Sequence, residues 1–347
     1  MIFSPWKIGE VTFRNRLVRS ATNMRMAGPR GEITEELIEV HRELAEGGIG
    51  LDVTGHAFVS PEGRANEGQI GVHEDFLSPG LARLAEAVHR AGARIFLQLA
   101  HAGMIARPLS GSRMGPYSRR GSKEMTQEEI ERVIASFVEG GRRAWEAGFD
   151  GVQLHAAHGY LLSQFLSPMI NKREDEYGGI RGGVRVLKRI ITGIKERAGE
   201  GFPVIVKIGM DKEGRGMGEE ELIEVIGEIL EAGLDGVEIS RGATDAKEII
   251  REGIVPHQNE AYNLDVARRV KGIFPSLPVI LVGGIRSVEV IEEVLSEGID
   301  AVALCRPLLA EPHLPRRWQE GDRRPSECIS CNRCIRVREK VKCRREN

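Results

Sequence analysis

The feature that most constrains the fold is a unit that recurs along the chain: a helix-like segment, a glycine, and then an apolar strand. The unit occurs at residues 46–55, 91–99, 147–155, 232–240 and 297–305. The glycine suits the C-terminal end of a helix, where a left-handed backbone is needed. The strands are mostly apolar and β-branched, which is typical of parallel strands buried on both faces. The repeat therefore predicts helices that alternate with parallel strands.

Further strands are expected at residues 17–23, 203–209 and 278–283, which completes a set of eight. Amphipathic segments at residues 126–146, 219–231 and 288–297 are expected to be helices, and Thr126 to Glu129 resembles a capping box. This alternation predicts an α/β fold with one closed (β/α)8 TIM barrel. An open doubly wound sheet is the alternative, but no Gly-x-Gly-x-x-Gly turn follows the first strand.

Two short segments are expected to lie outside the barrel. Residues 3–14 are typical of a hairpin with Gly9 and Glu10 at its turn, placed to plug the bottom of the barrel. Near the other terminus the chain becomes basic and rich in cysteine. We therefore expect a barrel domain over residues 1–325 and a cysteine-rich tail over residues 326–347.

The charge balance excludes several classes of partner. The chain of 347 residues has 49 basic and 51 acidic residues, a net charge of −2. Such a balance gives no general attraction to nucleic acid or to an anionic membrane. No apolar run approaches the roughly 20 residues that span a bilayer, and the N-terminus lacks a signal peptide's long apolar stretch. We expect a cytoplasmic protein.

The fourth expected strand ends in a group of polar side chains, His155, His158 and Tyr160. In a barrel of this class the carboxyl ends of the strands carry the chemistry. One histidine could instead cap a loop while the other binds backbone. A metal site is a further alternative, but no third ligand is visible nearby.

Other strand ends also carry polar residues. Gln98 closes the third strand, and its amide can both donate and accept. Lys207 lies in an otherwise apolar strand, where it must either pair with a charge or extend to the rim. The turns after the seventh and eighth strands form the usual phosphate site of such barrels, and they contain Gly283, Gly284, Cys305 and Arg306. A tight strand-to-helix turn would also explain the two glycines.

Six motifs, in order, resemble those of a known family. They lie at residues 15–22, 97–103, 155–160, 167–179, 282–285 and 306–312. Over residues 1 to about 318 the chain resembles the Old Yellow Enzyme family of FMN-dependent ene-reductases. It is similar in particular to the NADH:flavin oxidoreductases and to the barrel domain of 2,4-dienoyl-CoA reductase.

The resemblance implies an FMN cofactor, NAD(P)H as electron donor and a small-molecule alkene as substrate. It implies that His155 and His158 hold the substrate carbonyl oxygen and that Tyr160 gives a proton to the α carbon. It also implies a set of flavin-binding residues. These are Gln98, Lys207, Ala21, Thr22 and Gly55 at the ring, and Gly283, Gly284, Cys305 and Arg306 at the phosphate. Relatives usually have arginine in place of Lys207 and glycine in place of Cys305.

The tail carries four cysteines, Cys328, Cys331, Cys334 and Cys343. Four thiolates this close suit zinc or an iron–sulfur cluster. Multidomain relatives bind [4Fe–4S] at a similar stretch, although their cysteines are more widely spaced. The tail is therefore expected to hold a [4Fe–4S] cluster or zinc, or to bind no metal.

The sequence thus predicts an FMN-dependent oxidoreductase that reduces an activated C=C bond of an enoate, enone or dienoyl compound with electrons from NAD(P)H. We expect it to be a homo-oligomer. One alternative is an electron-transfer or demethylating component that works with a separate redox partner protein. Another is a flavin-free aldolase in which Lys207 forms a Schiff base.

Overall fold

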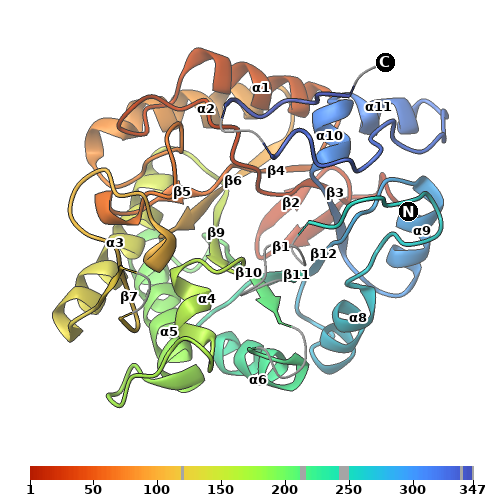
Figure 1. The fold of residues 1–347 in the computed structure, drawn as a ribbon. Helices are drawn as coiled ribbons and strands as arrows, with labels where there is room; N and C mark the ends of the chain where they lie inside the picture. Colours follow the sequence, from red (N-terminus) through yellow and green to blue (C-terminus); the bar gives the residue numbers. More distant parts are fainter. Residues whose placement is uncertain (119–120, 212–215, 242–249, 337–338, 346–347) are drawn as a thin grey trace.

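The computed structural model describes residues 1–118, 121–211, 216–241, 250–336 and 339–345, and they form a closed barrel surrounded by helices (Figure 1). The strands of the ring are β3 (Leu17–Arg19), β4 (Leu51–Val53), β6 (Arg94–Ala100), β9 (Gly151–Ala156), β10 (Val204–Met210), β11 (Gly236–Arg241), β12 (Val279–Val282) and β13 (Ala301–Leu304). Every neighbouring pair is parallel, and pairing of β4 with both β3 and β6 closes the ring. The predicted (β/α)8 barrel is confirmed.

Helices cover the outside of the ring. The longer ones are α1 (Glu35–Glu46), α2 (Ser78–Arg90), α3 (Gln127–Glu146), α5 (Gly179–Ala198), α6 (Glu219–Leu230), α8 (Leu264–Ile273) and α9 (Val288–Ser296). Short helices are α4 (Leu161–Leu166), α10 (Arg306–Ala310) and α11 (Leu314–Gln319), and short strands are β5 (Ala57–Phe58), β7 (Met114–Gly115) and β8 (Lys123–Glu124). The capping box is confirmed, because Thr126 and Glu129 each accept the other's backbone N–H. Of the helices described, none is both long and apolar enough to cross a membrane.

The repeated unit has a physical cause beyond its glycine. Gly148 and Gly298, which follow α3 and α9, have φ values of 82° and 89°, in the left-handed region that favours glycine. In three of the units an aspartate follows this glycine by two residues and accepts a backbone N–H at or next to the first residue of the neighbouring strand. Asp300 Oδ2 lies 2.8 Å from the nitrogen of Val279, and Asp235 Oδ2 lies 2.7 Å from that of Val204. These three units therefore end a helix and fix the start of the adjacent strand.

The predicted hairpin closes the amino-terminal end of the barrel. β1 (Trp6–Ile8) and β2 (Val11–Phe13) pair antiparallel around Gly9 and Glu10. Trp6, Ile8 and Phe13 are buried in one cluster with inward-facing residues of the strands, including Phe96. The ring of Phe13 lies 5.9 Å from that of Phe96, edge-on. This plug fills the barrel from below and leaves the carboxyl ends of the strands for a site.

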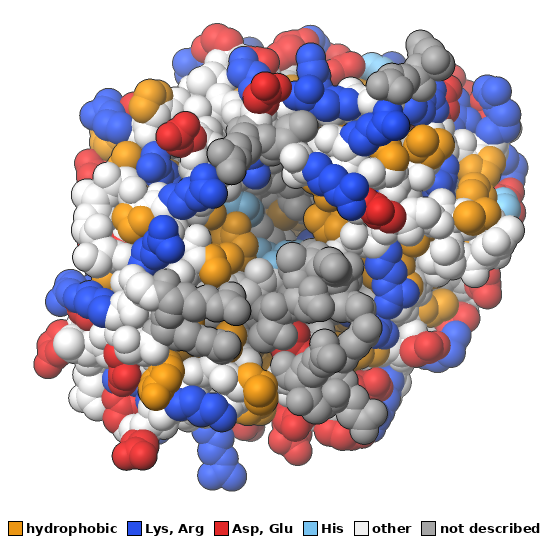
Figure 2. Space-filling view, in the orientation of Figure 1, with side chains coloured by type: hydrophobic (Ala, Val, Ile, Leu, Met, Phe, Trp, Pro, Cys, Tyr) orange, Lys and Arg blue, Asp and Glu red, His pale blue; other side chains and the backbone are white. Residues whose placement is uncertain are grey.

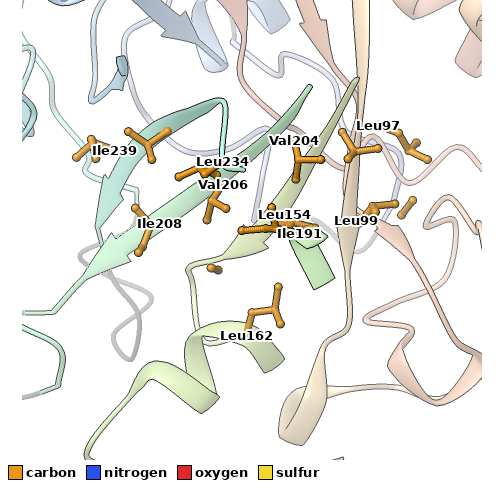
Figure 3. Packing of buried hydrophobic residues seen from close by; sticks show 14 of the residues in the cluster. Leu97, Leu99, Leu154, Leu162, Ile191, Val204, Val206, Ile208, Leu234 and Ile239 are labelled. Carbon is orange, nitrogen blue, oxygen red and sulfur yellow. The ribbon is translucent and has the colours of Figure 1, made fainter. Parts of the chain in front are cut away.

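The main core lies between the strands and the helices (Figure 3). Alternate residues of a strand point to opposite faces of a sheet, so Leu97 and Leu99 on β6 face the helices while Gln98 faces the interior. On β10, Val206 and Ile208 face the helices in the same way, and Lys207 faces the interior. The alternation places polar side chains inside the upper half of the barrel.

Packing of α3 on α5 requires a glycine, and this gives a stability prediction. A Cβ at Gly141 would lie 2.7 Å from Cγ1 of Ile194, whereas a Cβ at the exposed Gly272 in α8 meets nothing within 4 Å. We expect Gly141→Ala to destabilise the fold by about 1–3 kcal/mol through overpacking. Gly272→Ala should stabilise it by about 0.5–1 kcal/mol through helix propensity. Urea unfolding of both variants checks the pair, and equal shifts would contradict the close packing.

Candidate functional site

A cavity of about 300 Å3 lies at the carboxyl ends of the strands. Figure 2 shows the molecule hollowed at its centre, with histidine side chains inside the hollow and Lys and Arg side chains around it. Many of the predicted site residues line the cavity: Ala21, Thr22, His158, Tyr160, Lys207, Gly284, Cys305 and Arg306. The first strand is shorter than predicted. It ends at Arg19 because residues 20–23 leave the ladder and become part of the cavity wall.

The other predicted site residues, Gly55, Gln98, His155 and Gly283, lie just outside this lining. Gly55 permits a close approach of two chain segments, since a Cβ there would lie 2.7 Å from the carbonyl oxygen of Thr22. Gly283 similarly lies against residue 262, with the Cβ position 3.2 Å from its backbone nitrogen. Gln98 and His155 are 1% and 3% exposed. The roles predicted for these four residues stay predictions.

A polar network crosses the barrel interior beneath the cavity. Lys207 Nζ donates to Glu238 Oε1 at 2.9 Å and to Ser20 Oγ at 2.8 Å. Glu238 Oε2 accepts from the Gln153 amide at 2.7 Å. The amide nitrogen of Gln98 in turn donates to Gln153 Oε1 at 2.7 Å. Lys207 is therefore paired with a buried carboxylate, and of the two alternatives that the sequence left open this one is correct.

The two histidines and the tyrosine are brought together as predicted. The ring of His155 lies 5.0 Å from that of His158 and 4.6 Å from that of Tyr160. His158 has φ of 62°, in the left-handed region that is uncommon for residues other than glycine, and its Nε2 lies 2.9 Å from Ser240 Oγ. Burial lowers the pKa of both imidazoles well below the usual range, so they are neutral at physiological pH.

His56, which the sequence analysis missed, orients Tyr160. The backbone N–H of Ala65 donates to Gln69 Oε1, so the Gln69 amide nitrogen faces His56 Nδ1 at 2.8 Å. Burial lowers the pKa of His56 to about 4, and the neutral ring therefore carries its proton on Nε2. That N–H donates to the phenol oxygen of Tyr160 at 3.1 Å. The phenol proton is then free to point elsewhere. The available signal was the position of His56 directly after Gly55.

The tail packs over the barrel and completes the cavity wall. Ile335 and Val341 line the cavity. Arg306 Nη1 donates to Asn332 Oδ1 at 2.6 Å and to the carbonyl of Arg251 at 2.8 Å, and Arg286 holds a further tail carbonyl. Arg306 therefore both lines the cavity, as the phosphate prediction requires, and binds the tail, which the sequence did not indicate.

The four tail cysteines surround a second cavity of only about 20 Å3. All four are free thiols, and burial raises the pKa of Cys328 and raises that of Cys334 to about 12. Throughout the described part of the chain, no three His, Cys, Asp or Glu side chains are placed to hold one metal ion. The tail as arranged here does not fit zinc or an iron–sulfur cluster.

Known proteins match most of the length of this chain. The family model described as NADH:flavin oxidoreductase / NADH oxidase matches residues 1–324. The chain is 33% identical to a 4,4'-dithiodibutanoate disulfide reductase of Rhodococcus erythropolis, over 96% of the chain and 92% of the relative. It is 35% identical to an NADH oxidase of Thermoanaerobacter brockii, over 95% of the chain but 52% of the relative.

A solved structure has the same overall fold. A 2-naphthoyl-CoA reductase in complex with 2-naphthoyl-CoA superposes with a TM-score of 0.90 and 27% identity. The match covers 99% of this chain and 56% of that one. The chain thus spans about half the length of this structure and of the NADH oxidase.

The buried network gives a second stability prediction. Glu238→Ala would leave the Lys207 ammonium buried without its carboxylate, and we expect a loss of about 3–5 kcal/mol. Glu231→Ala removes a carboxylate at a similar distance, 2.8 Å, from the surface residue Lys188, and it should change stability little. Chemical denaturation of the two variants measures the difference. Similar midpoints would show that the network does not support the barrel.

Proposed function

The chain belongs to the NADH:flavin oxidoreductase / NADH oxidase family, and we propose that it uses FMN and NAD(P)H to reduce an activated C=C bond of a small molecule. The observation that carries this proposal is the grouping of three neutral proton donors: His158 and Tyr160 line the cavity, and His155 packs against both rings just behind the lining. Because the family is one of flavin oxidoreductases, we no longer consider Lys207 as the Schiff-base lysine of a flavin-free aldolase.

The residues at the cavity fit FMN. Lys207 and Arg306 place positive charge in the lining, which suits an anionic phosphate and the negative charge of a reduced ring. At Gly284 a Cβ would lie 2.9 Å from the Tyr262 ring, so only glycine leaves the backbone there in its present position. When bound, FMN would supply the redox chemistry, taking hydride from NAD(P)H and passing it to the β carbon of the alkene.

The histidines are suited to bind the substrate carbonyl oxygen. A neutral imidazole has one N–H to donate, and such donors stabilise the negative charge that develops on this oxygen as hydride arrives. His155 Nδ1 is buried and has no hydrogen-bond partner among the described residues. Because buried polar atoms are normally paired, an unpaired one on a ring that packs against two residues of the cavity lining supports ligand binding there.

Tyr160 is suited to donate the proton that completes the reaction. Burial raises the pKa of its phenol, so the group stays protonated at neutral pH. The N–H of His56 donates to the phenol oxygen, which leaves the phenol proton available to the α carbon of a substrate in the cavity. His56 and Gln69 act as positioning residues in this proposal.

Separate half-reactions test these roles. We expect Tyr160→Phe to slow reoxidation of reduced flavin by an activated alkene by about 10²-fold or more, the usual contribution of a general acid. His155→Ala combined with His158→Ala should abolish that step while FMN stays bound. Flavin reduction by NAD(P)H should change little in Tyr160→Phe, because no proton is needed from the phenol.

Stopped-flow absorbance follows the two steps in the same preparation. Tyr117→Phe is the matched control, since Tyr117 is exposed and does not line the cavity. Alkene reduction at the normal rate in the double histidine variant would refute the proposed binding of the carbonyl oxygen.

The tail cysteines have no role in the proposed reaction, because their arrangement does not fit a metal. The sequence left [4Fe–4S], zinc and a metal-free tail open, and the arrangement of the described residues favours free thiols. We therefore expect anaerobically purified protein to contain FMN without stoichiometric iron, zinc or labile sulfide. Metal and sulfide analysis decides this. About four irons per chain would restore the cluster, which would then either exchange electrons with a separate redox partner protein or serve structure only.

A further inference from the structure

A larger hollow, the cationic groove, opens beside the cavity. Its volume is about 910 Å3, within the size range of ligand sites. The groove is bounded by the segment after β3, residues 64–68, Glu36 on α1, and residues 339–344 of the tail. Arg25 lines both the groove and the cavity. A ligand long enough to pass Arg25 could therefore occupy both.

One extended stretch of the tail separates the two hollows. Val341 is 3% exposed, lines the cavity and donates its N–H to the carbonyl of Met24 at 3.0 Å. Its neighbours Lys340 and Lys342 line the groove instead. This is the alternation of an extended chain, in which successive side chains point to opposite sides. The contact of Val341 with the cavity thus fixes two lysines at the groove.

Positive charge exceeds negative charge in the groove. The cations are Arg25, Arg64, Lys340, Lys342 and Arg344, and the carboxylates are Glu36, Glu67 and Glu339. Lys340 pairs with Glu36, and Arg344 pairs with Glu339 at 2.8 Å.

Two of the remaining cations are well placed for an anion. Arg64 is held by backbone carbonyls, with Nε 3.1 Å from the oxygen of Arg107 and Nη2 3.3 Å from that of Pro108. These bonds orient the guanidinium without neutralising its charge. Lys342 is exposed and forms no ion pair with the residues that the structure describes. Guanidinium and ammonium groups together are a usual recognition set for phosphates.

We propose that the cationic groove binds the nucleoside diphosphate portion of a ligand whose reacting end lies in the cavity. The inference rests on the proposed function, in which the cavity holds the reacting groups. Two reactants have this chemistry: NAD(P)H carries adenosine diphosphate on its nicotinamide riboside, and a CoA thioester carries it on its acyl arm. Arg25 lies at the junction of the cavity and the cationic groove. We expect the uncharged part of the ligand to end there and its phosphates to begin.

Binding of ADP to the purified holoprotein tests the groove directly, by isothermal titration calorimetry at low salt. We expect Lys342→Glu to weaken ADP binding at least fivefold, because it replaces an attraction with a repulsion close to the phosphates. Lys7→Glu is the control with the same charge change, on the exposed side of β1 in the hairpin. It should leave the affinity within about twofold, since its charge lies beyond the screening length.

A variant that is expected to tighten ADP binding excludes misfolding as the cause of the changes in affinity. Glu67→Gln removes an exposed carboxylate from the groove and should tighten ADP binding by about two- to fivefold. No detectable binding of millimolar ADP, or equal loss in Lys342→Glu and Lys7→Glu, would overturn the proposal.

Competition identifies which reactant uses the groove. If ADP and its 2′-phosphate slow flavin reduction by NAD(P)H, the groove binds the hydride donor. If 3′-phospho-ADP slows reoxidation by an acyl-CoA alkene, the groove binds the thioester. The protein could bind ADP with the expected charge dependence and yet reduce no alkene. That result would refute the proposed function and support the groove as an ADP site. Alkene reduction without ADP binding would refute the groove alone.

Discussion

The buried ion pair between Lys207 and Glu238 is the interaction on which the site depends. Through Ser20, Gln153 and Gln98 it links β6, β9, β10 and β11 to the end of β3 directly beneath the cavity. A lysine inside a barrel is tolerated only with such a partner. Lys207 is in register with His155 on β9, so the same network fixes the level of the histidines. Donors held in this way need little reorganisation when charge develops on a substrate.

Tyr160 and the tail form parts of the cavity wall that lie above the buried network. The phenol is oriented by His56, and His56 by Gln69, so a loop after β4 sets the geometry of a residue after β9. On the other side, the tail contributes Ile335 and Val341 to the cavity and its lysines to the cationic groove. The cavity is therefore complete only when the segment after the last barrel helix is in place.

Local patterns in the sequence predicted the barrel well, because short apolar β-branched strands, helix-ending glycines and a capping box are short-range signals. They also placed His155, His158 and Tyr160 together, since one strand end carries all three. The sequence could not choose the partner of Lys207, because Glu238 lies 31 residues away on another strand. For Arg306 the sequence predicted only a phosphate contact. Its hydrogen bond to Asn332 could not be predicted, because the two segments come together only in the folded chain.

The central claim is that the cavity above the buried network holds FMN and passes electrons from NAD(P)H to an activated alkene. The most direct measurement is an anaerobic absorbance titration of the purified protein. The account predicts one FMN per chain, loss of the flavin absorption on addition of NAD(P)H, and its return on addition of an enone or enoate. A protein that neither contains nor takes up FMN would contradict the account, as would reduced flavin that no activated alkene reoxidises.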